Sequence, residues 1–141
     1  MEWAVVDASV VIKWVYSEDL SEDALAVRKR FRLVAPDLIV AEWSNILWKK
    51  VRRKDFRPDE ATLAAASLRH AGVELVPSME LSAGAIQLAI ELDHPAYDCF
   101  YLELCRFRSI AMVTADTRFA RKISAAKSLV LPPVITLGSL P

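Results

Sequence analysis

The stretch MVTADTRFAR, residues 112–121, combines the end of an apolar segment, a turn and the start of a helical pattern. The apolar run at residues 110–114 predicts a buried strand, and Asp116 stands where that strand leaves the core. Thr114 lies two residues earlier, on the same strand face. Because turns favour aspartate, one acid at a strand end carries little weight. The position becomes informative if other acids reach the same point.

Short apolar segments alternate with helical patterns on both sides of this stretch. Strands are expected at residues 2–6, 33–35, 73–76, 110–114 and 134–137. Helices are expected at residues 10–15, 21–31, 36–54, 58–72, 82–92, 98–106 and 117–126. The fourth helix is expected to end at Gly72, a natural C′ residue. This alternation predicts an α/β fold in which helices flank a central parallel sheet.

Composition limits the function classes that fit the chain. The 141 residues are expected to form one domain, and 54% of them are hydrophobic, enough to bury a core. The 18 basic and 18 acidic residues leave no net charge, which argues against a generally basic nucleic-acid binder. With three glycines and no glycine-rich loop, a nucleotide-binding Rossmann or P-loop fold is not expected.

The expected location is the cytoplasm. No apolar run approaches the roughly 20 residues of a membrane span, and the N-terminal residues do not resemble a signal peptide. Cys99 and Cys105 are expected on one helix, too far apart for a disulfide. Reduced thiols fit a cytoplasmic chain.

Four acids stand in or beside segments that are predicted to be buried. They are Asp7, Glu42, Asp98 and Asp116. Two of them follow strands, one lies on the apolar face of the long third helix, and one lies near a helix N-terminus. A buried charge is costly unless it is paired or binds a metal, and none of the four has an obvious basic partner at helical spacing. A positive group must therefore come from elsewhere in the fold or from a bound ion.

One shared pocket would explain all four acids. The carboxyl ends of parallel strands meet at one edge of a sheet, where such folds place their functional crevice. Crowded carboxylates repel one another, and a divalent cation relieves that repulsion. Ligands that are all oxygen favour Mg²⁺ or Mn²⁺ over Zn²⁺. Taken singly, each acid could instead be a helix cap, a turn residue or the partner of a distant arginine.

At this point the residues resemble a known family. The segments VVDASVVIKW, APDLIVAEWSN, YDCFYLEL and VTADTRF occur in this order. They look like the motifs of the PIN domain, and more closely those of the VapC toxins of prokaryotic VapBC toxin–antitoxin pairs. The resemblance runs over residues 5–137. It implies one PIN domain, residues 1–141, with a PIN-like α/β/α sandwich fold and a Mg²⁺- or Mn²⁺-dependent endoribonuclease activity that hydrolyses RNA phosphodiester bonds.

The resemblance also assigns roles to residues. By motif, the acidic quartet comprises Asp7, Glu42, Asp98 and Asp116. All of these except Glu42 are expected to hold the metal, and Glu42 either binds a second ion or positions the attacking water. Ser9 and Thr114 match the hydroxyl positions beside the first and last acids. Asn45 matches the polar residue one helical turn after the glutamate.

Partners follow from the same resemblance. It implies a small VapB-like antitoxin that blocks the acidic pocket, and a homodimer. Attraction for RNA phosphates must come from outside the acidic pocket, and Arg118 and Arg121 follow the last acid closely. Residues 49–57, KKVRRKDFR, carry six basic residues in nine, for which RNA binding and a solvated helix face are equally open.

Other function classes remain open at this point. One is a PIN nuclease of RNA maturation or DNA flap cleavage, which the lack of an extra domain disfavours. Another is a non-catalytic α/β binding module in which the acids are caps and hold a structural cation. A receiver-like phosphoacceptor domain would need an acidic pair after the first strand and a lysine after the last, and the chain shows neither.

Overall fold

Five parallel strands form one sheet in the order β3-β2-β1-β4-β5. The computed structural model describes residues 1–140. Its strands are β1 (Trp3–Val6), β2 (Arg32–Pro36), β3 (Val73–Val76), β4 (Met112–Thr114) and β5 (Val134–Thr136). The predicted central parallel sheet is therefore confirmed, with each strand within two residues of its expected bounds.

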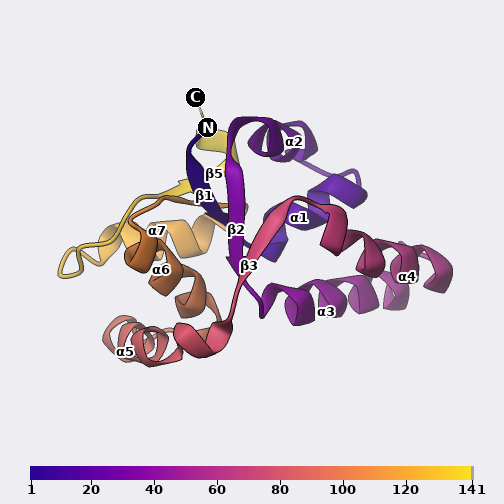
Figure 1. Ribbon diagram of the computed structural model, residues 1–141. Coiled ribbons are helices and arrows are strands. Elements are labelled where there is room, and N and C mark those ends of the chain that lie inside the picture. Colours follow the sequence, from indigo (N-terminus) through magenta and orange to yellow (C-terminus); the bar gives the residue numbers. More distant parts are fainter. Residues whose placement is uncertain (141) are drawn as a thin grey trace.

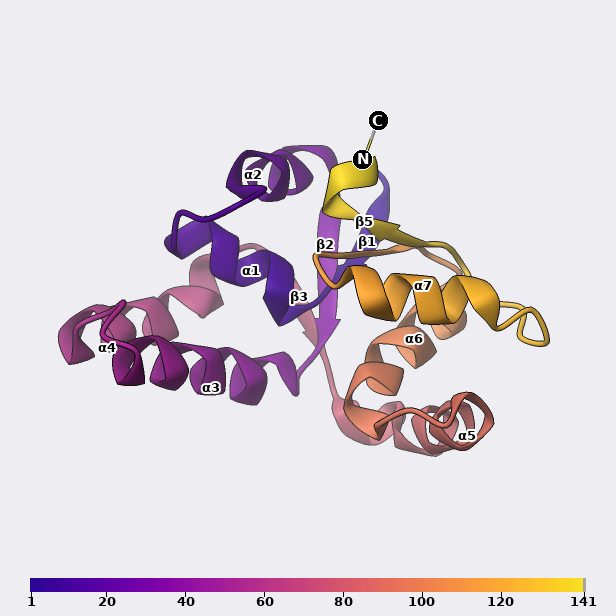
Figure 2. The ribbon, with the colours of Figure 1, turned by 180° about the vertical axis from the view of Figure 1, so that it is seen from behind.

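Helices cover both faces of the sheet. They are α1 (Ala8–Val15), α2 (Ser21–Arg30), α3 (Ile39–Arg52), α4 (Pro58–Ser67), α5 (Ser82–Leu92), α6 (Ala96–Arg108) and α7 (Thr117–Ala125), with 3₁₀ turns η1 (Leu68–His70), η2 (Ser78–Glu80) and η3 (Leu137–Ser139). Figures 1 and 2 show α1 to α4 on one side of the sheet and α5 to α7 on the other. This is the expected α/β/α sandwich. Among residues 1–140, no helix has the length and apolar content to cross a membrane.

The central strand β1 sets the position of the site. Ala4, Val5 and Val6 have no exposed surface, as a strand buried on both faces requires. Val6 lies opposite Val113 of β4, and both strands run in the same direction. Their carboxyl ends therefore lie side by side at one edge of the sheet.

Among the helices of residues 1–140, only α5 has its expected bounds. α1 begins two residues earlier than expected, α3 begins three residues later and ends two earlier, and α2 and α7 each end one residue earlier. The changes in α4 and α6 bear on the site. α4 ends at Ser67, and a 3₁₀ turn carries the chain on to Gly72, which has φ +78° and reverses the chain into β3. The prediction that this helix ends near Gly72 was wrong for the α-helix itself, which stops at Ser67 and continues as a 3₁₀ turn to His70. α6 begins at Ala96 rather than Asp98, since Pro95 has the fixed φ that suits the residue before a helix. Asp98 is thus the third residue of α6.

Candidate functional site

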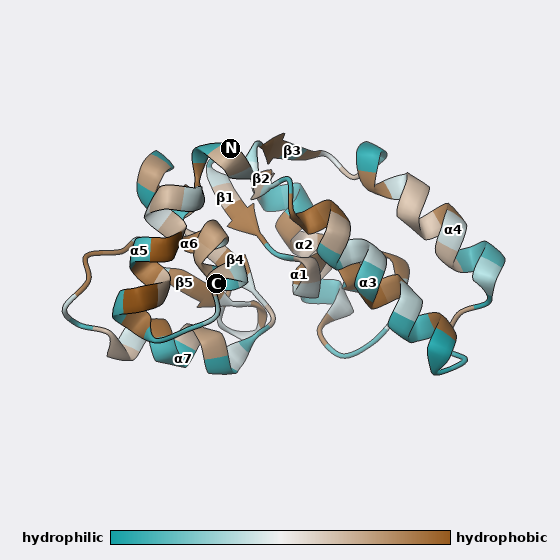
Figure 3. Ribbon diagram, turned by 90° about the horizontal axis from the view of Figure 1, so that it is seen from below, coloured by the Kyte–Doolittle hydropathy of each residue, from teal (hydrophilic) through white to brown (hydrophobic). Residues whose placement is uncertain are grey.

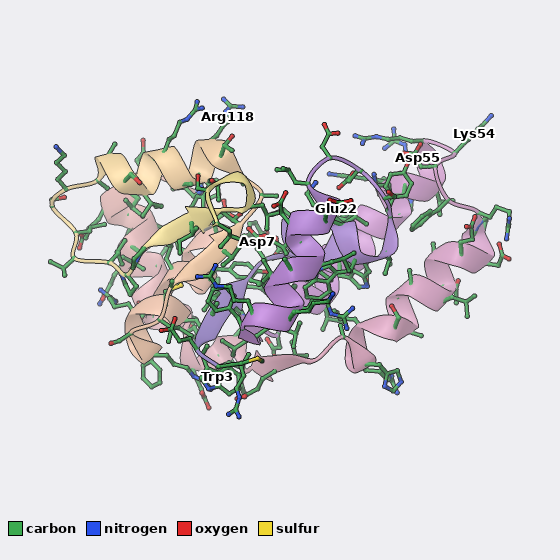
Figure 4. The ribbon with its side chains drawn as sticks, turned by 90° about the horizontal axis from the view of Figure 1, so that it is seen from above. Trp3, Asp7, Glu22, Lys54, Asp55 and Arg118 are labelled. Carbon is green, nitrogen blue, oxygen red and sulfur yellow. The ribbon has the colours of Figure 1, made fainter. Side chains whose placement is uncertain are left out.

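Asp7 lies where β1 ends and α1 begins, and its carboxylate is held from two sides. It is the N-cap of α1, in an extended backbone conformation. Oδ1 accepts hydrogen bonds from the Ser9 backbone N–H at 3.1 Å and the Ser9 hydroxyl at 2.5 Å. Oδ2 accepts from the Thr114 hydroxyl at 2.6 Å. Asp7 is half-buried, and Figure 4 shows it between the α1 side of the molecule and α7.

The two hydroxyls connect Asp7 to the end of β4. Ser9 Oγ accepts a hydrogen bond from the Ala115 backbone N–H at 3.0 Å. Thr114 Oγ1 accepts from the Asp116 backbone N–H at 3.0 Å, and Thr114 is fully buried. Each hydroxyl therefore donates to Asp7 and accepts from the turn after β4. The structure places both of the hydroxyl residues named by motif between the first and last acids.

Asp116 is the N-cap of α7. Its Oδ1 accepts from the Phe119 backbone N–H at 3.0 Å, so the acid does serve as a helix cap. Its side chain lies on the exposed side of the site. Oδ2 accepts no hydrogen bond from residues 1–140, so capping and ligand binding are compatible at this residue.

Glu42 is held from the opposite helical layer. The Tyr101 hydroxyl of α6 donates to Glu42 Oε1 of α3 at 2.6 Å, and Tyr101 is 1% exposed. This tyrosine was not among the predicted site residues. Its position three residues after Asp98 could have identified it, because this spacing puts both side chains on one helix face. Asn45 follows Glu42 by one turn and is exposed, and its side chain makes no hydrogen bond with the described part of the chain.

Asp98 has a basic partner that the sequence analysis missed. His94 Nε2 lies 2.6 Å from Asp98 Oδ2. The expectation that no acid has a basic partner at this spacing was therefore wrong for Asp98. The two residues are four apart, but His94 belongs to the loop before α6, where helical spacing is not assumed.

Burial and mutual repulsion dominate the electrostatics of the site. Burial raises the pKa of Asp7 to about 6, hydrogen bonds from Ser9 and Thr114 oppose the rise, and the charge of Asp98 adds to it. Burial also raises the pKa of Glu42, against the hydrogen bond from Tyr101, and the charges of Asp7 and Asp98 raise it further. The site therefore holds negative charge that its own donors only partly balance.

The acids are near one another without forming a closed metal cage. Across residues 1–140, no three Asp, Glu, His or Cys side chains are gathered closely enough to hold one ion. Asp98, Asp116 and Glu42 are each turned to a protein donor through one oxygen. The assignment of metal ligands therefore stays a prediction.

Basic residues lie both beside the acids and far from them. A cavity of about 940 Å³ opens next to Asp116, between α7, β5 and η3, and Arg121 lines it. Figure 4 places Arg118 on α7 at the same end of the molecule, and Lys54 at the far end of α3 from Asp7. Lys54 is therefore remote from Asp7, whereas Arg121 lines the cavity beside Asp116.

The raised pKa of Asp7 predicts how metal-free stability depends on pH. Asp7 has an ordinary pKa of 3.8 when unfolded and about 6 when folded, so the folded protein holds this proton more tightly. Stability is then lost as pH rises from about 4 to 6, and the penalty stays in full above that window. Asp7→Asn should raise the free energy of unfolding by up to about 3 kcal/mol at pH 7.5 and by much less at pH 4.

Urea denaturation in EDTA at several pH values measures this difference. Asp19→Asn, at an exposed acid outside the site, is the matched control and should shift stability little at any pH. A gain for Asp7→Asn that is the same at pH 4 and pH 7.5 would contradict the electrostatic account.

Comparisons with known proteins agree with this geometry. The PIN domain family matches residues 4–123. Ribonuclease VapC3 of Pyrobaculum aerophilum is 32% identical over 124 residues, which cover 86% of this chain and 95% of that protein. The crystal structure of PAE2754 from Pyrobaculum aerophilum superposes with a TM-score of 0.66 at 20% identity, covering 98% of this chain and 90% of that one.

A further solved structure shares the fold. VapBC2 from Rickettsia felis, bound to a DNA fragment from their promoter, gives a TM-score of 0.62 at 13% identity, with 96% of this chain and 97% of that chain covered. At these identities the solved structures show a common fold, and the family match and the 32% identical relative show kinship. The chain belongs to the PIN-domain family, among its VapC-type members.

Proposed function

We propose that this chain is a metal-dependent endoribonuclease that acts as the toxin of a VapBC-type toxin–antitoxin pair. The observation that carries the proposal is the Asp7 carboxylate at the carboxyl ends of β1 and β4, where burial and the charge of Asp98 raise its pKa. The 32% identity to a protein named as a ribonuclease supports the same activity. A cytoplasmic location fits that function.

The candidate ligand atoms of the site suit a hard divalent cation. The candidate ligands are carboxylate oxygens, which Mg²⁺ and Mn²⁺ prefer. Asp98 and Asp116 each keep one oxygen that accepts no hydrogen bond from residues 1–140. Together with Asp7 they would hold the ion. When bound, the ion would supply a water of lowered pKa and balance the charge that develops on the phosphate.

The chain's own residues would orient the reaction. Ser9 and Thr114 fix the Asp7 carboxylate, so its direction is set before substrate binds. Tyr101 holds Glu42 through Oε1 and leaves Oε2 without a hydrogen bond from residues 1–140. Burial raises the pKa of Glu42, which makes its carboxylate a stronger proton acceptor. We assign Glu42 Oε2 as the atom that accepts the proton of the attacking water.

Partners are part of the proposal. An antitoxin is supported by the VapC-type relationship, and the negative charge of the site suits an arginine or another basic blocking group. A homodimer is supported by apolar side chains at the surface of α5, where Ile86 and Ile90 are 51% and 73% exposed. Figure 3 shows much of α5 in hydrophobic brown and the far end of α3 in hydrophilic teal.

The direct test of the proposal is RNA cleavage by the purified chain with Mg²⁺, Mn²⁺ or EDTA. Asp7→Asn and Asp116→Asn keep side-chain size and remove charge, so each should lower the cleavage rate by more than about 100-fold, the upper range for changes outside the first ligand shell. EDTA should abolish cleavage. Asp19→Asn is the control and should cleave like the natural chain.

Two outcomes would count against the proposal. Cleavage that persists in EDTA would remove the metal from the account. No cleavage of total cellular RNA by folded, metal-loaded protein would favour a binding module with a structural cation.

RNA is proposed to reach the site along α7. Arg121 lines the cavity beside Asp116, and Arg118 lies on the same helix. In the Asp7→Asn background, Arg121→Ala should weaken binding of single-stranded RNA and lower the slope of log affinity against log salt by about 0.7, the value for one lost phosphate contact. Fluorescence anisotropy measures both. The matched control is Arg69→Ala, at an exposed arginine in η1.

An unchanged salt slope for Arg121→Ala would show that this arginine makes no phosphate contact. The RNA path would then be sought at residues 49–57, where Lys49, Arg52 and Arg53 line a smaller hollow of about 350 Å³.

A further inference from the structure

His94 lies between a lysine and one of the four acids. Its Nε2 is 2.6 Å from Asp98 Oδ2, and its Nδ1 is 3.1 Å from Lys122 Nζ. The His94 side chain is 16% exposed, and its ring packs against Phe119 with the ring centroids 5.2 Å apart. Packing on one face and polar contacts at both nitrogens leave the ring little freedom to turn.

The lysine determines which nitrogen carries the ring proton. An ammonium group has three donors and no acceptor. Nδ1 of His94 must therefore accept from Lys122, which leaves the proton on Nε2. Nε2–H then donates to Asp98 Oδ2. The order Lys122, His94, Asp98 is thus a directed chain of hydrogen bonds that ends on a carboxylate of the site.

Helix α7 holds this chain in place. Lys122 also donates to the Asp93 backbone carbonyl at 3.0 Å, at the left-handed residue that ends α5, where φ is +49°. Phe119 supports the His94 ring from the same helix. Asp116 caps this helix. One helix therefore carries one acid at its N-terminus and, through His94, fixes the direction of another.

We propose that His94 is a positioning residue that fixes the Asp98 carboxylate for cation binding, and that Lys122 sets the tautomer of His94. The inference rests on the proposed function, in which Asp98 holds the ion. The Asp98 side chain is 41% exposed, so without His94 it would sample several rotamers. The hydrogen bond to Oδ2 restricts it and leaves Oδ1 for the ion. Residues that orient metal ligands in this way commonly contribute 10- to 100-fold in metal affinity.

Two amide substitutions distinguish the effect of the hydrogen-bond donor at Nε2 from the effect of losing the ring. The amide nitrogen of glutamine reaches the place of Nε2, whereas that of asparagine reaches only the place of Nδ1. His94→Gln keeps a donor for Asp98, and His94→Asn removes it. Isothermal titration of metal-free protein with Mn²⁺ should give a dissociation constant raised by about 10- to 100-fold for His94→Asn and within about threefold for His94→Gln. Lys122→Met should raise it less than His94→Asn, and the exposed control Lys127→Met should not change it.

A purely structural role predicts a different pattern. In that case the two His94 variants would lose similar stability in EDTA and bind Mn²⁺ alike. Equal affinities for His94→Asn and the natural chain would overturn the inference, as would equal weakening by both variants.

Asp98→Asn separates failure of the positioning role of His94 from failure of the proposed cation site. If it loses Mn²⁺ affinity while His94→Asn does not, only the positioning role fails. If the natural chain binds no Mn²⁺, the proposed function fails with it.

Discussion

The rest of the site depends on one half-buried carboxylate at the end of the central strand. Asp7 follows three residues without exposed surface, and burial raises its pKa to about 6. A carboxylate in such a place needs donors, and the fully buried Thr114 of the adjacent strand supplies one. Every further acid increases the repulsion, so each neighbour needs an anchor of its own. The negative charges of neighbouring acids, which hydrogen-bond donors balance only in part, favour a bound cation.

Each acid of the site is anchored by a different part of the fold. The anchors are a hydroxyl pair for Asp7, the hydroxyl of Tyr101 for Glu42, the N-terminus of α7 for Asp116 and an imidazole for Asp98. Tyr101 joins the two helical layers, because it reaches from α6 to α3. Glu42, Asp116 and Asp98 each contact a protein donor through one carboxylate oxygen. The other oxygen of each has no hydrogen bond from residues 1–140. This arrangement fixes the direction of the acids while leaving oxygens for a ligand.

Local patterns predicted most of the fold, and they placed the proposed site at the carboxyl ends of the strands. β3 and α5 have the expected bounds, because their apolar periods and flanking turn residues agree. The anchors Tyr101 and His94 were missed for a physical reason. An apolar helix face explains a tyrosine without any partner, and a loop histidine shows its partner only when the loop is folded. Contacts between layers are properties of the tertiary structure, which spacing along one segment does not encode.

The central claim is that these acids form a cation site, and anomalous scattering from crystals grown with Mn²⁺ at pH 7.5 tests it most directly. The account predicts one strong peak about 2 Å from the Asp7 carboxylate, with oxygens of Asp98 and Asp116 turned toward it and His94 still bound to Asp98. It would be contradicted if Mn²⁺ at saturating concentration left this edge of the sheet without a peak.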